Sequence, residues 1–278
     1  MDWVQTPFLG VASRVWAMGL TFADHVRETG EKADAPVVFA KTCRPSLGGG
    51  HLHLPSQDAL AQALFAVSPA RQQRLAARRS SWPVLLDYEV ELGMVLLDDW
   101  QIGQSMPRIG YVLVNDLTAR SIQIAGLGVD DPAPYWSAAK GFVGFLPMSS
   151  RMGCPNEAEA GAWSDTNLST RVNGQLRQHS PLRNMLYTPL QVLAHAADHA
   201  PGHSLMRHDV VLTGTPAGIA LQVPRWKRRL ANCLPYEMAV HSAWRSQAAC
   251  DRFLQAGDLV EVSADGFGAL SSSIQGPV

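Results

Sequence analysis

The sequence predicts an α+β protein that is mainly β. Apolar and β-branched runs of strand length recur along the chain and dominate its second half. Few of these runs are joined by helices long enough for crossover connections, which argues against a doubly wound sheet. No internal repeat or low-complexity tract is visible, so a solenoid is excluded as well.

The length and composition limit the kind of domain. The chain has 278 residues, of which 46% are hydrophobic and 17% charged. This apolar content can fill a sizeable core in one large domain, or in one domain with a small appendage. The cysteines are scattered without a Cys-x-x-Cys pair, which indicates neither a zinc knuckle nor a disulfide framework.

The predicted elements follow in chain order. Strands are expected at 35–41, 83–97, 109–116, 168–174, 208–214 and 258–266. Helical patterns lie at 68–80, 117–127 and 188–200, and a short helix is expected around 22–29. A glycine- and proline-rich stretch near 45–56 divides the chain into an N-terminal segment, 1–56, and a second unit, 57–278.

The charge pattern excludes several classes of partner. The formal net charge is -1 and the pI is about 6.7. The densest basic stretches, 70–79 and 225–229, are short, whereas proteins that bind nucleic acid show a larger positive footprint. The N-terminus lacks the pattern of a signal peptide, and no segment runs for about 18 apolar residues without a charge. We therefore expect no nucleic acid, no membrane and a cytoplasmic location.

An acidic pattern interrupts the apolar run 83–97. Asp87, Glu89 and Glu91 occupy every second position, so on a strand their side chains point to one face. That face is either open to water, as in many antiparallel sheets, or it holds something positive. Glu89 and Glu91 lie about 6.5 Å apart along a strand, close enough to converge on one ion. Oxygen ligands favour Mg²⁺, Mn²⁺ or Ca²⁺ over zinc.

Three regions beyond this run offer further candidates. Asp116 ends the strand 109–116, where functional side chains tend to project, although it can also cap the following helix. Arg120 and Gln123 are neighbours on one helix face, either solvated or directed at the same site. There Arg120 can balance the acidic cluster or bind a substrate carboxylate. Lys140 is a lone charge in an apolar loop, either snorkelling to the surface or lying over an enolate or carboxylate.

Two more patterns suit hydrolysis. His25 and Glu28 are three residues apart on the short predicted helix, and a carboxylate beside an imidazole suits a general base that activates water. An ordinary surface helix can contain the same pair. Thr215 lies in the turn of "VVLTGTPAG" (210–218), which either exposes backbone N–H groups and a hydroxyl to an anion or is purely structural.

Taken in order, eight segments resemble the fumarylacetoacetate hydrolase family, in particular its acylpyruvate hydrolase-like branch. They are "FADHVRETG", "PVVFAK", "DYEVELG", "GYVLVNDLTARSIQ", "AKGFVGFLPM", "VNGQLRQ", "DVVLTGTPAG" and "AGDLVEVSADGFGAL". The resemblance covers the chain from about Gly19 onward. It implies a β-roll of mixed sheets, a homodimer, and a small N-terminal segment that contributes a lid helix.

The resemblance also implies roles for particular residues. Glu89, Glu91 and Asp116 would bind a divalent ion, usually Mg²⁺, with Mn²⁺ and Ca²⁺ as alternatives. The positions that match substrate-contacting or oxyanion-supporting residues are Arg120, Gln123, Lys140 and Thr215. His25 and Glu28 match the lid-helix dyad that activates water. Asp87 matches no such position, so we expect it behind the metal ligands or in solvent.

The sequence departs from the family pattern in four places. The usual Gly-x-Asn-Tyr before the lid is Gly19-Leu20-Thr21-Phe22, and the frequent Asp after Lys-Gly-Phe is Val143. Two insertions of helical pattern lie near 57–81 and 224–254. These insertions could cover the pocket or extend a dimer contact, so they bear on which substrate is used.

The resemblance implies a metal-dependent hydrolase that cleaves a carbon–carbon bond in an acylpyruvate or a related β-diketo acid through a metal-stabilised enolate. The partner would be a small-molecule keto acid. The same site would also suit decarboxylation of oxaloacetate-like acids or isomerisation of unsaturated keto diacids, in which no water attacks. A third hypothesis is a metal-binding relative without activity, for which Thr21 and Val143 are the only hints.

Overall fold

The computed structural model describes residues 1–6, 14–30, 35–77, 82–155, 162–222 and 234–277. The basic stretch 225–229 and parts of both predicted insertions, 78–81 and 224–233, lie outside the described residues. In the part of the chain that is described, no helix is long and apolar enough to cross a membrane.

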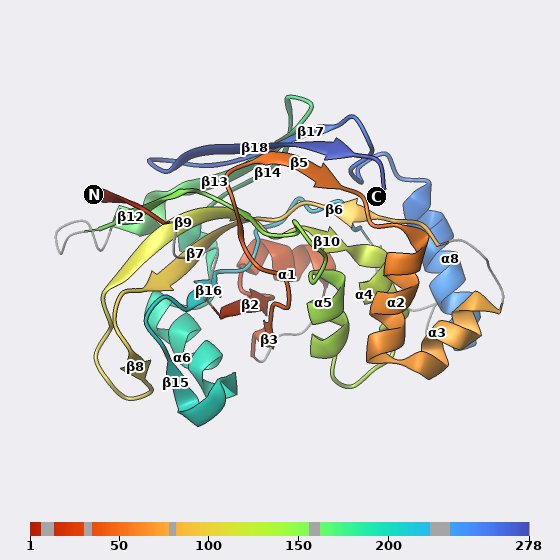
Figure 1. Cartoon of the computed structure of the whole chain (residues 1–278), viewed down its shortest axis with the longest axis horizontal. Coiled ribbons are helices and arrows are strands. Elements are labelled where there is room, and N and C mark those ends of the chain that lie inside the picture. Colours follow the sequence, from red (N-terminus) through yellow and green to blue (C-terminus); the bar gives the residue numbers. More distant parts are fainter. Residues whose placement is uncertain (7–13, 31–34, 78–81, 156–161, 223–233, 278) are drawn as a thin grey trace.

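Two mixed sheets form most of the structure, which confirms the predicted α+β, mainly β class (Figure 1). In the described ranges the larger sheet has the order β1-β12-β9-β7-β16-β2-β3, and β11 joins β4 to β9. Its strands are β1 (Asp2–Gln5), β2 (Val15–Gly19), β3 (Val37–Ala40), β4 (Ser46–Leu47), β7 (Val90–Leu96), β9 (Ile109–Asn115), β11 (Pro147–Met148), β12 (Arg151–Cys154) and β16 (Val210–Leu212). β16 runs parallel to β2 and antiparallel to β7, so the sheet is mixed.

The second sheet lies across β7 and β9, at the top of Figure 1. Its order is β14-β13-β17-β18-β5. Its strands are β5 (Gly50–His53), β13 (Asn167–Val172), β14 (Gln175–Pro181), β17 (Leu259–Ala264) and β18 (Gly268–Gln275). Short pairs join β6 (Leu86–Asp87) to β10 (Thr118–Ala119), and β8 (Trp100–Gln101) to β15 (Ser204–Leu205). The boundary at residue 56 stays a prediction; β2 and β5, which precede it, pair with β16 and β18, which follow it.

The helices pack at the sides of the sheets. They are α1 (Ala23–Thr29), α2 (Gln57–Val67), α3 (Pro69–Ala76), α4 (Arg120–Ala125), α5 (Ala133–Ala139), α6 (Pro189–His199) and α8 (Tyr236–Ala248), with 3₁₀ turns η2 (Ala162–Asp165), η3 (Leu182–Asn184) and η4 (Pro201–His203). Local sequence explains several starts: Ser56 and Ser68 cap α2 and α3, and Thr188 with Gln191 forms a capping box at α6. In Figure 1, α2, α3, α4, α5 and α8 gather at the right-hand side.

Hydrophobic clusters cover both faces of the larger sheet. On β9, Val112 and Val114 belong to the cluster that includes the right-hand helices, whereas Tyr111 and Leu113 belong to the cluster against α6 and the second sheet. Because alternate side chains of a strand point to opposite faces, β9 is buried on both. The centre of this sheet therefore has no face open to water.

The acidic run differs from the predicted continuous strand. It is broken between β6 and β7, and at the break the backbone N–H groups of Glu89 and Val90 bond to the side chains of Asn115 and Gln178 at 3.0 and 3.1 Å. The alternative that the acidic face is open to water is wrong as well, since Asp87, Glu89 and Glu91 are 0%, 5% and 1% exposed.

Other elements lie where the sequence predicts none. β14 and β18 are polar strands with one exposed face, so they lack the apolar run by which strands are recognised. Helix α5 occupies a stretch interpreted as an apolar loop, and Lys140 directly follows its last residue. That lysine is therefore fixed by a helix end, not by a loop.

Candidate metal centre

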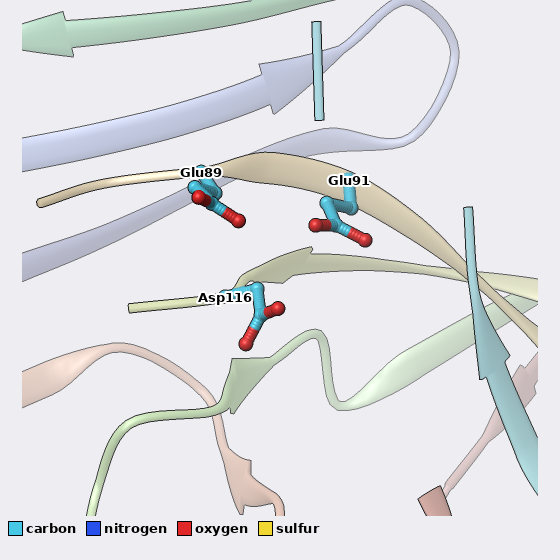
Figure 2. Close-up of side chains that lie close together, drawn as sticks. All are labelled: Glu89, Glu91 and Asp116. Carbon is cyan, nitrogen blue, oxygen red and sulfur yellow. The ribbon is translucent and has the colours of Figure 1, made fainter. Parts of the chain in front are cut away.

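The strand pairing brings three carboxylates together. β7 and β9 are antiparallel neighbours, with Glu91 opposite Val114, and the N–H of Asp116 donates to the carbonyl of Glu89 at 2.8 Å. Glu91 on β7 and Glu89, directly before the first residue of β7, project toward Asp116, which directly follows β9, as Figure 2 shows. One oxygen from each of these buried residues lies within 4.8 Å of the others.

Cations surround two of the three carboxylates. The Lys140 Nζ lies 2.5 Å from Glu89 Oε2 and 2.6 Å from Asp116 Oδ2. Arg120 forms an ion pair with Glu89 as well. Burial alone would raise the pKa of Glu89, but the charges of Lys140 and Arg120 outweigh it and lower this pKa to about 2. Glu89 is therefore ionised at any ordinary pH.

Glu91 lies in a different environment. Its Oε2 accepts the Gly214 N–H at 2.7 Å, and none of the described lysines or arginines forms an ion pair with it. Burial, with the nearby charge of Asp116, raises its pKa well above the ordinary range. A divalent cation would supply the missing positive charge, and three convergent carboxylate oxygens suit a hard ion. The residues present therefore fit such a metal.

Lys41 is a site residue that the sequence analysis missed. Its buried Nζ forms an ion pair with Asp116 Oδ1 and donates to the Phe145 carbonyl at 3.3 Å. It follows β3, whose buried residues form the core of the predicted strand 35–41. A lysine that ends a buried strand is itself a signal, since such a charge is seldom buried without a partner.

Arg120 and Gln123 lie next to the cluster, from the first turn of α4. The Arg120 guanidinium donates to Gln123 Oε1 at 2.6 Å and to Asp87 Oδ2 at 2.7 Å, and it pairs with Glu89. All three of its nitrogens thus bond to protein groups. In this structure Arg120 balances the acidic cluster, which was one of the two predicted roles.

Asp87 lies behind Arg120 and not on the carboxylate cluster. It is fully buried, so the expectation of a solvated role is wrong. Its oxygens accept the backbone N–H groups of Tyr88, Ala220 and Leu221 at 2.9, 2.8 and 3.1 Å, in addition to Arg120 Nε. Asp87 therefore joins β6, α4 and the chain after the 210–218 turn.

The predicted pair on α1 faces the same place. His25 Nδ1 lies 3.6 Å from Glu28 Oε2, and this buried nitrogen has no hydrogen-bond partner. Glu28 is held by the N–H of Gly218, which donates at 3.0 Å. His25 is 7% exposed, so the helix presents it inward.

A small cavity joins these residues. It is lined by Met18, Gly19, Leu20, His25, Glu89, Arg120, Gln123, Trp136, Lys140 and Thr215. Its volume of about 30 Å³ has room for about two water molecules. The structure thus brings the predicted imidazole, lysine, arginine, glutamine and threonine to one space beside Glu89.

Thr215 is fixed by a buried network. Its hydroxyl donates to the Val90 carbonyl at 3.2 Å and accepts from Gln178 Nε2 at 2.9 Å. Gln178 also bonds to the Val90 N–H, Thr170 and Pro216, so one buried amide joins β14, β7 and the turn. No pattern in the sequence indicates this role, because glutamines are common in polar strands.

Known proteins resemble this chain over most of its length. The family model described as "Fumarylacetoacetate (FAA) hydrolase C-terminal" matches residues 14–275. An uncharacterised protein of Archaeoglobus fulgidus is 27% identical over 219 residues, which are 76% of this chain and 71% of that protein. The oxaloacetate tautomerase YisK of Bacillus subtilis is 23% identical over 290 residues, covering 98% of this chain and 72% of YisK.

Solved structures share the fold. A fumarylpyruvate hydrolase from Pseudomonas aeruginosa, in complex with Mn²⁺ and pyruvate, superposes with a TM-score of 0.62 at 19% identity over 95% of this chain and 90% of that one. A 5-carboxymethyl-2-hydroxymuconate delta-isomerase from Mycobacterium smegmatis gives 0.59 at 23% identity over 96% and 80%.

Proposed function

The chain belongs to the fumarylacetoacetate hydrolase family, and from this premise we propose that it is a metal-dependent hydrolase that cleaves a carbon–carbon bond in an acylpyruvate or a related β-diketo acid. The observation that carries the proposal is the buried His25, which has an unpartnered ring nitrogen, has Glu28 beside it and lines the same cavity as Glu89. We further propose that the protein acts as a homodimer.

Glu89, Glu91 and Asp116 would hold the metal, which we propose to be Mg²⁺, with Mn²⁺ as the alternative bound by the related fumarylpyruvate hydrolase. When bound, a divalent ion acts as a Lewis acid that polarises a substrate carbonyl and favours the enolate. Lys41 and Lys140 pair with Asp116 and Glu89, respectively, beside the place where the metal would be held.

His25 would act as the general base. Its imidazole takes a proton from water, and the resulting hydroxide adds to the acyl carbonyl of the substrate. The bond between that carbon and the methylene carbon then breaks, which releases a carboxylic acid, and the proton returns to the methylene carbon to give pyruvate. Glu28 stabilises the imidazolium that forms between these steps.

Lys140 and Gln123 would stabilise the oxyanion. Burial alone lowers the pKa of Lys140, but the charges of Asp116 and Glu89 outweigh burial and raise this pKa, so the ammonium group keeps its charge. Thr215 or Arg120 would hold the substrate carboxylate. All of these side chains line the same cavity, which must widen from its volume of about 30 Å³ before one small keto acid can contact them together.

A second candidate is keto–enol isomerisation or decarboxylation of an oxaloacetate-like acid. The observation that favours it is the similarity to YisK, named an oxaloacetate tautomerase, over nearly the whole chain. These reactions use the same carboxylates, lysines and arginine but need no attacking water. A metal-binding protein without activity is the remaining alternative.

Turnover of a panel of acylpyruvates and oxaloacetate, with Mg²⁺ or Mn²⁺, tests the proposal through the loss of enol absorbance. We expect acylpyruvate cleavage that chelation abolishes and that His25→Ala reduces by about 10²- to 10⁴-fold, the range typical of a general base. If His25→Ala retains full activity on oxaloacetate and the wild type cleaves no acylpyruvate, the second candidate is correct. Full activity after chelation would refute both.

A further inference from the structure

Side chains from two other helices cap the carboxyl end of α4. Arg71 Nη1, from α3, donates to the carbonyls of Ala125 and Leu127, both at 2.9 Å. The hydroxyl of Tyr236, the first residue of α8, donates to the Ala125 carbonyl at 2.7 Å. The last carbonyls of a helix have no partner within it, and a cation there also complements the helix dipole.

These capping groups hold one another. The Arg71 guanidinium lies over the Tyr236 ring, 4.4 Å from its centre, and 5.6 Å from the Tyr135 ring on α5. Arg74, one turn along α3, also lies near the Tyr236 ring, 5.1 Å from its centre, and pairs with Glu237 of α8, but among the described residues it donates no hydrogen bond to α4. Helices α3, α5 and α8 therefore meet where α4 ends.

The beginning of α4 is anchored by α8 as well. The fully buried Trp244 of α8 donates its indole N–H to the Ser121 carbonyl at 3.1 Å, and its ring packs against Trp82 with centres 5.4 Å apart. With six residues, α4 is too short to be stable alone, so its position comes from such tertiary contacts.

The first turn of α4 carries site residues. Arg120 and Gln123 are bonded to each other and line the cavity beside Glu89. No residue of α2, α3 or α8 is among the residues that line this cavity. The helices predicted as insertions thus contact the helix that carries the site residues, and not the cavity itself.

We propose that Arg71 and Tyr236 are positioning residues for the two site residues of α4, Arg120 and Gln123. Through them, α3 and α8 act on the reaction by way of α4. The kinetic test of this inference rests on the proposed function. Displacement of reacting groups by about 1 Å can lower the rate by about 10²-fold. Loss of the caps would let α4 shift along its axis, and Gln123, only two residues before Ala125, would move with it.

The first test compares two matched variants on α3. Arg71→Met keeps an apolar stem beside the Tyr236 ring but removes the donors to α4, and we expect kcat/KM to fall about 10- to 100-fold. Arg74→Met, the control, removes a guanidinium that is 55% exposed in its side chain, and we expect a change of less than about 2-fold. Tyr236→Phe, which deletes a single hydroxyl, should lower kcat/KM about 3- to 10-fold and serves as the test if Arg71→Met does not fold.

A double-mutant cycle separates positioning from general destabilisation. In a Gln123→Ala background, Arg71→Met should lower kcat/KM by a smaller factor than in the wild type, because one of the two groups through which it acts is already gone. The proposal would be overturned if the effects of Gln123→Ala and Arg71→Met on kcat/KM multiply in full. It would also be overturned if Arg74→Met lowers kcat/KM as much as Arg71→Met does.

A second readout does not depend on turnover. The Arg120 Nε–H and Gln123 side-chain amide signals in a nitrogen–proton NMR spectrum can be assigned by their loss in Arg120→Lys and Gln123→Ala. We expect both signals to shift in Arg71→Met and to stay in place in Arg74→Met. If no keto acid is turned over but the signals shift, the proposed function fails and the positioning role stands. Unshifted signals in an active enzyme refute the positioning role.

Discussion

Replacement of Asp87 by asparagine removes one charge from the interior and changes almost nothing in shape. In the wild type, Oδ1 accepts from the N–H groups of Tyr88 and Ala220, and Oδ2 accepts from Arg120 Nε and the Leu221 N–H. The asparagine amide nitrogen cannot accept a hydrogen bond. Whichever way the amide turns, two donors face an NH₂ group.

The cost follows from the contacts that are lost. Hydrogen bonds to charged groups contribute about 1.5–3 kcal/mol each, and two are lost. Removal of one partner from a buried ion pair typically costs about 3–5 kcal/mol, because the other charge stays buried. The two hydrogen bonds correspond to about 3–6 kcal/mol, and the ion-pair figure is an upper value because Arg120 keeps its ion pair with Glu89, so we expect a loss of about 3–5 kcal/mol in the free energy of unfolding. With an m-value near 3 kcal/mol per M, the urea midpoint should fall by roughly 1–2 M.

Urea unfolding followed by tryptophan fluorescence measures this shift. Asp98→Asn is the matched control, since Asp98 pairs with Arg108 at the surface, where the two side chains are 42% and 76% exposed. We expect its midpoint to stay close to that of the wild type. If Asp87→Asn moves the midpoint no more than Asp98→Asn does, the buried pairing between Asp87 and Arg120 is not a structural support.

Three further predictions concern Glu91 and its neighbour Gly214. Glu91→Gln should abolish the binding of Mn²⁺ that calorimetry detects in the wild type. Glu261→Gln, on β17 of the second sheet, should leave this binding unchanged. Because the pKa of Glu91 in the metal-free protein is raised above 4.5, the unfolded chain loses this proton first. The free energy of unfolding of the metal-free wild type, relative to that of Glu91→Gln, should then fall as the pH rises above 4.5. A difference between the two proteins that does not change with pH would contradict this. Metal binding to the wild type should release protons. Gly214→Ala should lower the free energy of unfolding, measured by chemical denaturation, by about 1–3 kcal/mol. The reason is that φ of Gly214 is +79° and a Cβ there would lie 2.1 Å from Thr21 Oγ1. Gly103→Ala, where a Cβ would meet open space, should lower it by less.

The acidic cluster could be predicted from the sequence because its members lie at the adjoining ends of two neighbouring strands. Glu89 and Glu91 occupy alternate positions, and Asp116 directly follows β9, which pairs with β7 and is separated from it along the chain only by the two-residue strand β8. Strands that are close in sequence usually lie side by side, so local order is enough to bring the three together.

Lys41, Asp87 and Gln178 could not be assigned in the same way. Lys41 reaches Asp116 only because β2 and β16 place β3 in the same sheet as β9, a relation of non-consecutive strands. The partners of Asp87 include the N–H groups of Ala220 and Leu221, more than a hundred residues away in the chain. Such partners depend on register and tertiary packing, which periodicity does not reveal.

The parallel pairing of β5 with β18 has a consequence for biosynthesis. β5 emerges from the ribosome early, yet in the described sheet order its neighbour is β18, which is made long afterwards. Until then β5 has backbone groups without strand partners and can pair with other chains. A nascent chain cut short before Gly268 would keep that edge open, so proteolytic or chaperone surveillance has an obvious segment to bind.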